Sequence, residues 1–141
     1  MRRYVLDANA LLILLADRPG AKRVDRLLQE AARAEMPVFM SAVNWGEMVY
    51  SMRKAGGEAE AKRMVRSVEQ LALNIVSADR DRATTAGEYK AVYGLAYADS
   101  FAASLAQELR ATLITADPDF RKVGKKLKVE FLPRHEASTK N

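Results

Sequence analysis

The sequence predicts an α/β fold, a three-layer α/β/α sandwich around a central, mainly parallel sheet of four to five strands. Short β-type runs alternate with helical segments along the chain, and strands separated by helices of about ten to fifteen residues imply right-handed βαβ crossovers. Such crossovers cover a parallel sheet on both faces. The 141 residues show no repeat or interdomain linker, so we expect one domain at residues 1–135 and a polar tail at residues 136–141.

The first four elements follow from apolar spacing and from the positions of proline and glycine. Residues 3–6 form a β-type run, and residues 9–16 form an apolar helical segment that stops at an Arg-Pro-Gly turn. Residues 21–35 carry apolar side chains at helical spacing and end before Pro37. Residues 38–40 are the second expected strand.

Two helices are expected in the middle of the chain. Ser41 is suited to cap a helix over residues 42–54, because its hydroxyl can accept a hydrogen bond from a backbone N–H of the first turn. The Gly56-Gly57 pair ends that helix. A further helix over residues 58–73 places its apolar residues on one face.

The second half of the chain continues the alternation. A weak strand at residues 74–77 leads to a helix capped by Asp79, and a new helix with an apolar stripe begins around Asp99. Residues 112–115 have the composition of a buried strand, and residues 129–132 form a last one.

Four acidic residues fall where these elements meet. Asp7 and Asp117 follow strands, and Glu47 and Asp99 lie near the starts of helices. Each has an ordinary structural explanation, because an aspartate at these places suits a helix N-cap and a glutamate suits an exposed helix position. In an open parallel sheet, however, the strand carboxyl ends and the following helix N-termini meet at one edge. We therefore expect the four carboxylates to share one crevice.

A shared crevice of this kind predicts a metal site. Carboxylates that lie close together repel one another and acquire raised pKa values unless cations neutralise them. Oxygen ligands without His or Cys select hard ions such as Mg²⁺ or Mn²⁺, and these ions support in-line hydrolysis of a phosphodiester. The sequence leaves open whether one ion or two bind.

The composition limits the classes of partner and of active site that the chain can have. Lys and Arg number 23 against 18 Asp and Glu, a net charge of +5, which fits a polyanionic partner or a solvated basic surface. Cysteine is absent and the lone histidine, His135, is in the polar end, so thiol-based and histidine-based sites are disfavoured. The lack of cysteine suits a reducing compartment, and the longest apolar stretch, residues 8–16, is too short to span a bilayer. We expect a cytoplasmic protein without a membrane partner.

Four segments carry a resemblance to a known family: VLDANALL at residues 5–12, SAVNWGE at 41–47, GLAYADSFAASLA at 94–106 and LITADPDF at 113–120. On these segments the chain resembles the PIN-domain ribonucleases, and within them the VapC-type toxins of toxin–antitoxin pairs. The resemblance covers almost the whole chain. It implies a PIN-like fold and a Mg²⁺- or Mn²⁺-dependent endoribonuclease, whose catalytic and metal-binding residues are Asp7, Glu47, Asp99 and Asp117.

The resemblance also implies partners: an RNA substrate, a VapB-like antitoxin whose tail occupies the acidic groove, and a second copy in a homodimer. It does not name the RNA, because recognition depends on groove shape and on contacts to unpaired bases. A run of cations directly after Asp117 can engage RNA phosphates beside the acids or form a solvated face. The run consists of Arg121, Lys122, Lys125, Lys126 and Lys128.

Four further residues near the motifs have open roles. Thr115 matches a family position for a small hydroxyl residue that hydrogen-bonds a carboxylate, and it also suits a plain strand end. Asn9 and Asn44 stand where similar proteins often carry Ser or Thr, and either can hydrogen-bond in the pocket. Asp119 is either a further ligand or part of an Asp-Pro-Asp turn.

Three alternatives to an active nuclease stay open. A catalytically inactive PIN-fold scaffold that binds RNA or assembles with partners would keep the fold and the basic surface. An aspartyl-nucleophile phosphatase also begins with Asp after the first strand, but it needs a second acid where this chain has Asn9. A phosphoacceptor receiver domain needs a lysine at the end of a late strand, which this sequence lacks.

Overall fold

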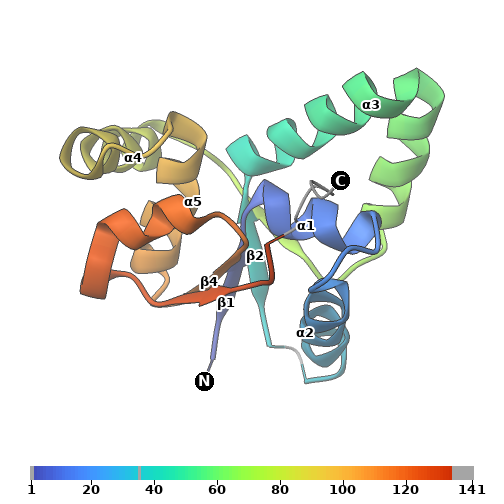
Figure 1. Ribbon diagram of the computed structural model, residues 1–141, viewed down its shortest axis with the longest axis horizontal. Helices are drawn as coiled ribbons and strands as arrows, with labels where there is room; N and C mark the ends of the chain where they lie inside the picture. The colour runs from blue at the N-terminus through green and yellow to red at the C-terminus, as the bar shows by residue number, and fades with distance from the viewer. Residues whose placement is uncertain (1, 35, 135–141) are drawn as a thin grey trace, which may run out of the picture.

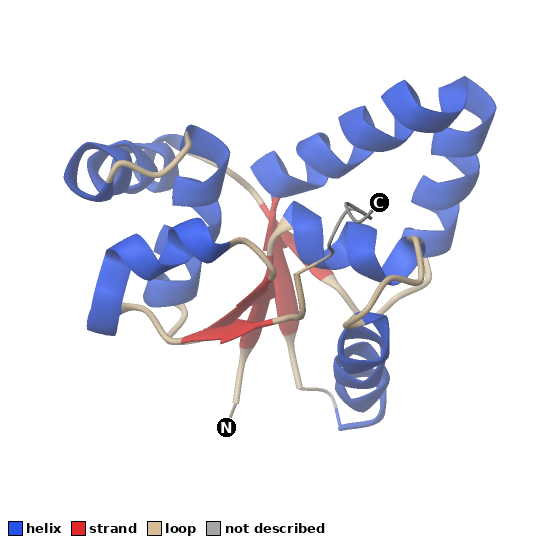
Figure 2. Cartoon of the chain, in the orientation of Figure 1, coloured by secondary structure: helices blue, strands red, loops and turns tan. Residues whose placement is uncertain are grey.

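The computed structural model describes residues 2–34 and 36–134, which form a five-stranded sheet between two groups of helices (Figure 2). The strands are β1 (Tyr4–Leu6), β2 (Val38–Ser41), β3 (Asn74–Val76), β4 (Thr112–Thr115) and β5 (Val129–Phe131). Their order in the sheet is β3-β2-β1-β4-β5, and all four pairings are parallel. The predicted α/β/α sandwich is confirmed. His135 and the predicted tail at residues 136–141 lie outside the described residues.

Each group of helices covers one face of the sheet (Figure 1). One face carries α1 (Ala8–Leu15), α2 (Ala21–Ala34) and α3 (Ala42–Glu69), and the other carries α4 (Arg80–Tyr93), α5 (Tyr97–Glu108) and the 3₁₀ segment η1 (Pro118–Lys126). Successive side chains of a strand point to opposite faces. Tyr4 and Leu6 of β1 therefore pack with the first group and Val5 with the second, and all three are buried.

Gly57 divides α3 into two arms. Its φ of 86° and ψ of −179° are not helical, and residues other than glycine rarely adopt a positive φ of this kind. The sequence predicts two helices separated at Gly56-Gly57, and the structure joins them into one element with a kink there. In Figure 1 the two arms extend beyond the sheet and frame α1. None of the helices in the described part of the chain combines the length and apolarity of a membrane span.

The helix caps agree with the sequence at all but one of the predicted positions. The side chains of Asp7, Ser41 and Asp79 accept hydrogen bonds from backbone N–H groups of the helices that follow them. The predicted N-cap role of Asp99 is wrong: α5 begins at Tyr97, and its N-cap, Ala96, makes no side-chain hydrogen bond. Asp99 lies in the first turn instead, where the helix dipole favours a negative charge.

The sheet topology decides which predicted residues meet. β1 lies between β2 and β4, so the carboxyl ends of these three strands are side by side. β1 ends at Leu6, β2 at Ser41 and β4 at Thr115, and each strand runs directly into a segment that carries a predicted acid. A hydrogen bond from the Asp7 N–H to the Ile114 carbonyl, 3.4 Å long, continues the β1–β4 pairing to this edge.

Candidate active site

An acidic pocket of about 480 Å³ lies at the carboxyl edge of the sheet, and all four predicted acids line it. Asp7 follows β1, Asp117 follows β4, Glu47 is in the second turn of α3, and Asp99 is in the first turn of α5. The fold thus brings together four segments that are far apart in the sequence. This arrangement is the crevice that the parallel sheet predicts.

Asp7 is the most buried of the four acids, with 3% of its surface exposed. Its Oδ1 accepts a hydrogen bond of 2.8 Å from the Ala10 N–H, and its Oδ2 accepts one from the Thr115 hydroxyl. Burial raises the pKa of Asp7 to about 7; the two hydrogen bonds lower it, and the carboxylates of Asp99 and Asp117 raise it further. A carboxylate in this setting favours a cation beside it.

Asp99 is half-buried, and neighbouring charges shift its pKa. Burial raises the pKa of Asp99 to about 6, the carboxylates of Asp117, Glu47 and Asp119 raise it further, and Lys122 lowers it. The acids therefore interact electrostatically, as expected for a shared crevice. Lys122 is the member of the basic run whose charge acts on this pocket.

Thr115 links the two aspartates that follow strands. Its hydroxyl donates to Asp7 Oδ2 and accepts a hydrogen bond of 3.0 Å from the Asp117 N–H. Thr115 is fully buried, so one side chain orients the carboxylate of Asp7 and the backbone of Asp117. The predicted hydrogen bond from this hydroxyl to a carboxylate is confirmed.

Asn9 and Asp119 differ in their relation to the pocket. Asn9 lines it, and its Oδ1 accepts a hydrogen bond of 3.2 Å from the Ala116 N–H, which ties α1 to the loop after β4. Asp119 is exposed and does not line the pocket; its backbone N–H donates to Asp117 Oδ1 at 2.9 Å. Asp119 therefore belongs to the turn, while its charge still reaches Asp99.

Asn44 connects Glu47 to α5. Asn44 is fully buried, and its Nδ2 donates to Glu47 Oε1 at 3.2 Å and to the Ala98 carbonyl at 3.1 Å. Its Oδ1 is also buried and has no hydrogen-bond partner among the described residues. The i, i+3 spacing of Asn44 and Glu47 is a sequence signal for the first contact. The second joins residues 54 positions apart and has no local signal.

Two arginines at the rim of the acidic pocket are residues that the sequence analysis missed. Arg18 lies in the loop between α1 and α2, and Arg134 follows β5; both line the pocket and both are exposed. Arg134 had a signal, because a residue after the carboxyl end of β5 emerges at the same edge as Asp7 and Asp117. Arg18 lies in a loop between two helices, and no comparable rule predicts its position at the pocket.

The structure separates the basic run into two parts. β5 is parallel to β4, with Val129 paired to Leu113, so the chain returns to the amino edge of the sheet before β5 begins. Lys126 and Lys128 lie beside Ala111, just before β4, and not beside Asp117. The expected position next to the acids is therefore wrong for these two lysines.

The donor chemistry of the acidic pocket fits a divalent cation. Across residues 2–34 and 36–134, no three His, Cys, Asp or Glu side chains are close enough to hold one ion among them. The four carboxylates thus line the pocket without converging on a single point. Mg²⁺ commonly binds one or two carboxylates and keeps several waters, so pairs of these acids are sufficient, and the raised pKa values of Asp7 and Asp99 favour a cation.

Comparison with protein families finds a match to the PIN domain over residues 4–126. Comparison with curated proteins finds no significant match.

Solved structures share the fold at low sequence identity. VapBC from Salmonella typhimurium, bound to DNA, has a TM-score of 0.74 and 18% identity, over 93% of this chain and 98% of that chain. VapBC2 from Rickettsia felis, bound to a promoter fragment, has a TM-score of 0.73 and 18% identity, over 93% and 99%. VapC20 from Mycobacterium tuberculosis, a toxin that cleaves the sarcin–ricin loop, has a TM-score of 0.68 and 16% identity, over 92% and 99%.

Proposed function

Because this chain belongs to the PIN domain family, we propose that it is a metal-dependent endoribonuclease that hydrolyses RNA phosphodiester bonds, and the toxin of a toxin–antitoxin pair. The observation that carries the proposal is the acidic pocket, in which four carboxylates from separate segments act on one another. The shared fold with VapC20, which cleaves the sarcin–ricin loop, supports an RNA substrate.

Asp7, Glu47, Asp99 and Asp117 are assigned as the catalytic and metal-binding residues, with Mg²⁺ or Mn²⁺ as the ion. When bound, such an ion supplies a Lewis acid for a phosphate oxygen and lowers the pKa of a water molecule. The protein contributes orientation: Thr115 and the Ala10 N–H fix both oxygens of Asp7, and Asn44 holds Glu47. A nearby positive charge also lowers the raised pKa values of Asp7 and Asp99.

The cations around the pocket are assigned to the substrate. Arg18 and Arg134 at the rim, and Lys122 near Asp99, can hold the phosphates on either side of the cleaved bond. A guanidinium matches a phosphate through two parallel hydrogen bonds. In this arrangement the acids face the reacting phosphate, and the arginines bind the neighbouring phosphates of the RNA backbone.

A VapB-like antitoxin and a second copy of the chain are the proposed protein partners, in the cytoplasm. The VapBC complexes of the same fold support the first. A hollow of about 560 Å³ inside the bend of α3, lined in part by Val49, Ala61 and Val65, offers an apolar surface for an antitoxin segment. Val92 and Tyr97 are apolar side chains that are 72% and 48% exposed, as contact residues for a second copy would be.

The test of the proposed activity is cleavage of labelled RNA by the purified protein with Mg²⁺ or Mn²⁺. Asp99→Asn should abolish cleavage while the protein keeps its circular dichroism spectrum and its RNA binding. Asp81→Asn, an equivalent change at an exposed aspartate of α4, is the matched control and should cleave normally. Full cleavage by Asp99→Asn in excess EDTA would contradict the proposal.

Thermal denaturation with added metal separates an active nuclease from an inactive scaffold. A ligand that binds only the folded protein stabilises it, by about 2.7 kcal/mol at a hundred times its Kd. Mg²⁺ or Mn²⁺ should therefore raise the melting temperature of the native protein but not that of Asp7→Asn. Equal shifts in both proteins, or none in either, would favour the scaffold.

A further inference from the structure

The edge of the sheet opposite the acidic pocket is basic. In a parallel sheet the amino ends of all strands lie at one edge, and cations stand just before three of them: Arg3 before β1, Arg110 before β4 and Lys128 before β5. All three are exposed, as is the neighbouring Lys126. The chain thus presents carboxylates at one edge of the sheet and cations at the other.

Three of these cations line a hollow of about 440 Å³, here called the basic hollow. Arg110, Lys126 and Lys128 line it together with the uncharged residues Gln107 and Leu127, and no carboxylate lines it. A cluster of cations without a counter-charge is electrostatically unfavourable, because the like charges repel one another. A negatively charged ligand would relieve this repulsion.

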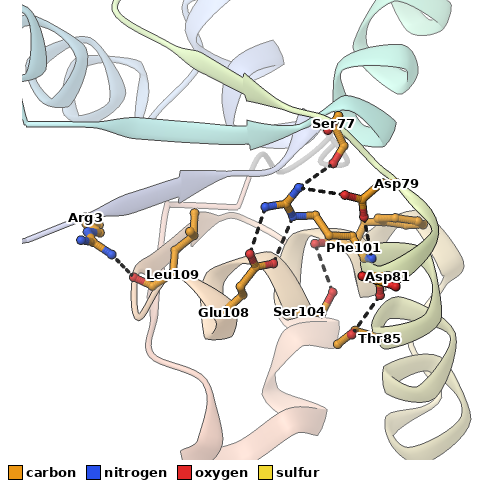
Figure 3. Close-up of polar contacts among 10 residues, drawn as sticks. Arg3, Ser77, Asp79, Asp81, Thr85, Phe101, Ser104, Glu108 and Leu109 are labelled. Carbon is orange, nitrogen blue, oxygen red and sulfur yellow. Dashed lines mark hydrogen bonds and ion pairs between the residues drawn. The ribbon is translucent and has the colours of Figure 1, made fainter.

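The acids nearest in sequence to these cations are already bound elsewhere. Glu108 accepts hydrogen bonds from Arg82 Nε and Nη2 at 3.1 and 3.0 Å. Figure 3 shows the Glu108 carboxylate turned away from Arg3. Glu130 is held by Arg23 at 2.7 and 3.0 Å. Within the described residues, no ion pair joins Arg110, Lys126 or Lys128 to a carboxylate.

Arg3 has a structural role that does not extend to the two lysines. Its Nη1 donates to the Leu109 carbonyl at 3.1 Å, at the carboxyl end of α5 (Figure 3). A cation at this end of α5 complements the helix dipole. The dipole therefore explains the position of Arg3, and in part that of Arg110, which directly follows the C-cap of α5. Lys126 ends the 3₁₀ segment η1 and Lys128 lies beyond it. Unlike Arg3, neither lysine donates a side-chain hydrogen bond to a carbonyl of α5 among the described residues.

We infer that the basic hollow binds the phosphate backbone of single-stranded RNA, as a contact separate from the acidic pocket. Several lysines and arginines around one hollow match a chain of phosphates, and binding of this kind releases counterions and is independent of sequence. The α-carbons of Arg110 and Asp117 are at most about 25 Å apart, the extended length of the seven residue steps from one to the other. An RNA of about twenty nucleotides can therefore reach both sites at once.

The inference rests on the proposed RNA substrate but not on cleavage, so the test uses binding. Fluorescence anisotropy of a labelled RNA of about twenty nucleotides would be measured over a range of salt concentrations, in the Asp99→Asn background. The test variant is Arg110→Gln with Lys126→Gln and Lys128→Gln. The control removes the same charge from the exposed face of α2, through Lys22→Gln, Arg26→Gln and Arg33→Gln.

The expected result is a difference between these two triple variants. Each phosphate contact contributes about 0.7 to the slope of log K against log salt for a single strand, so the test variant should lose about 2 from the slope and bind roughly tenfold more weakly. The control should lose less than about threefold in affinity.

Several outcomes would overturn the inference. Equal losses in both triple variants would mean that only net charge matters, and no RNA binding by the parent would exclude the ligand. Polyglutamate that competes with RNA for the hollow at equal affinity, or inorganic phosphate that saturates it alone, would assign it to an acidic protein or a free anion. Lys126→Gln alone, with an expected slope change of about 0.7, decides the matter if the triple variant folds poorly.

Discussion

The acidic pocket has two walls that are built in different ways. On the strand wall, Asp7 and Asp117 follow adjacent strands and share the Thr115 hydroxyl. On the helix wall, Asp99 and Glu47 belong to α5 and α3, which are connected here through Asn44. Sheet pairing thus fixes the first wall directly, whereas the second depends on a contact between helices. The two walls should therefore differ in how much activity and stability depend on each residue.

The largest expected difference is in the rate of cleavage. Asp7→Asn should lower the single-turnover rate about a thousandfold, the size of effect seen when one preorganised electrostatic contact is removed from an active site. Glu47→Gln should lower it about tenfold, because Glu47 is exposed and water can replace part of its contact. Equal losses in the two variants would mean that the walls contribute alike.

The strand wall was also the more predictable part of the site. Asp7 and Asp117 could be placed from sequence because a residue just after a central parallel strand has only one edge at which to emerge. Asp99 was placed by its position near a helix start together with the family resemblance, and Glu47 mainly by the resemblance, since helix periodicity does not say how two helices approach one another. The N-cap role expected for Asp99 was wrong because α5 starts at Tyr97, two residues before it.

The basic run was predicted to lie beside the acids, and this was wrong for two of its lysines. Local sequence does not show where the chain returns to the amino edge of the sheet. Lys126 and Lys128 are close to Asp117 in sequence, but η1 carries them to the start of β5 at the amino edge. Once β5 is placed parallel to β4, both the position of the lysines and that of Arg134 follow. The order and direction of the strands therefore decided more of the charge distribution than local spacing did.

The second prediction concerns stability without metal, where burial of Asp7 matters most. Burial raises the pKa of Asp7 from 3.8 to about 7, so between these values the folded protein holds a proton that the unfolded chain has released. The free energy of unfolding therefore falls as pH rises from about 4 to 7. The Asp7 contribution is fully present below pH 4 and lost above pH 7, and a shift of this size corresponds to roughly 4 kcal/mol.

Urea unfolding in EDTA at pH 4 to 8 measures this contribution as the difference between the native protein and Asp7→Asn. The variant should be the more stable of the two at pH 8, and the difference should shrink toward pH 4. Asp99, with a pKa of about 6, contributes in the same direction and less. Saturating Mg²⁺ should reverse the order at pH 8. A difference independent of pH would contradict the burial of a titrating Asp7.

The third prediction tests whether Thr115 holds the strand wall together. Thr115→Val keeps the shape of the side chain but removes the donor to Asp7 and the acceptor for the Asp117 N–H. Loss of a partner that orients a metal ligand commonly costs about tenfold to a hundredfold in affinity or activity. We expect that loss in the apparent Mg²⁺ affinity, together with a higher pKa of Asp7, because the hydroxyl lowers it. Thr115→Ser keeps the hydroxyl and should retain most activity.

The smallest expected effect is at Asn44, on the helix wall. Asn44→Ala removes the hydrogen bonds to Glu47 and to the Ala98 carbonyl, which should destabilise the fold by about 1–2 kcal/mol and lower cleavage about threefold. If Asn44 acts on catalysis through Glu47, the double variant with Glu47→Gln should cleave no more slowly than Glu47→Gln alone. Asn74→Ala, which removes an asparagine bound to the Val38 carbonyl away from the pocket, is the control for loss of stability. Additive losses in rate would show instead that Asn44 positions Asp99 through α5, so that the two acids of the helix wall are held by the same side chain.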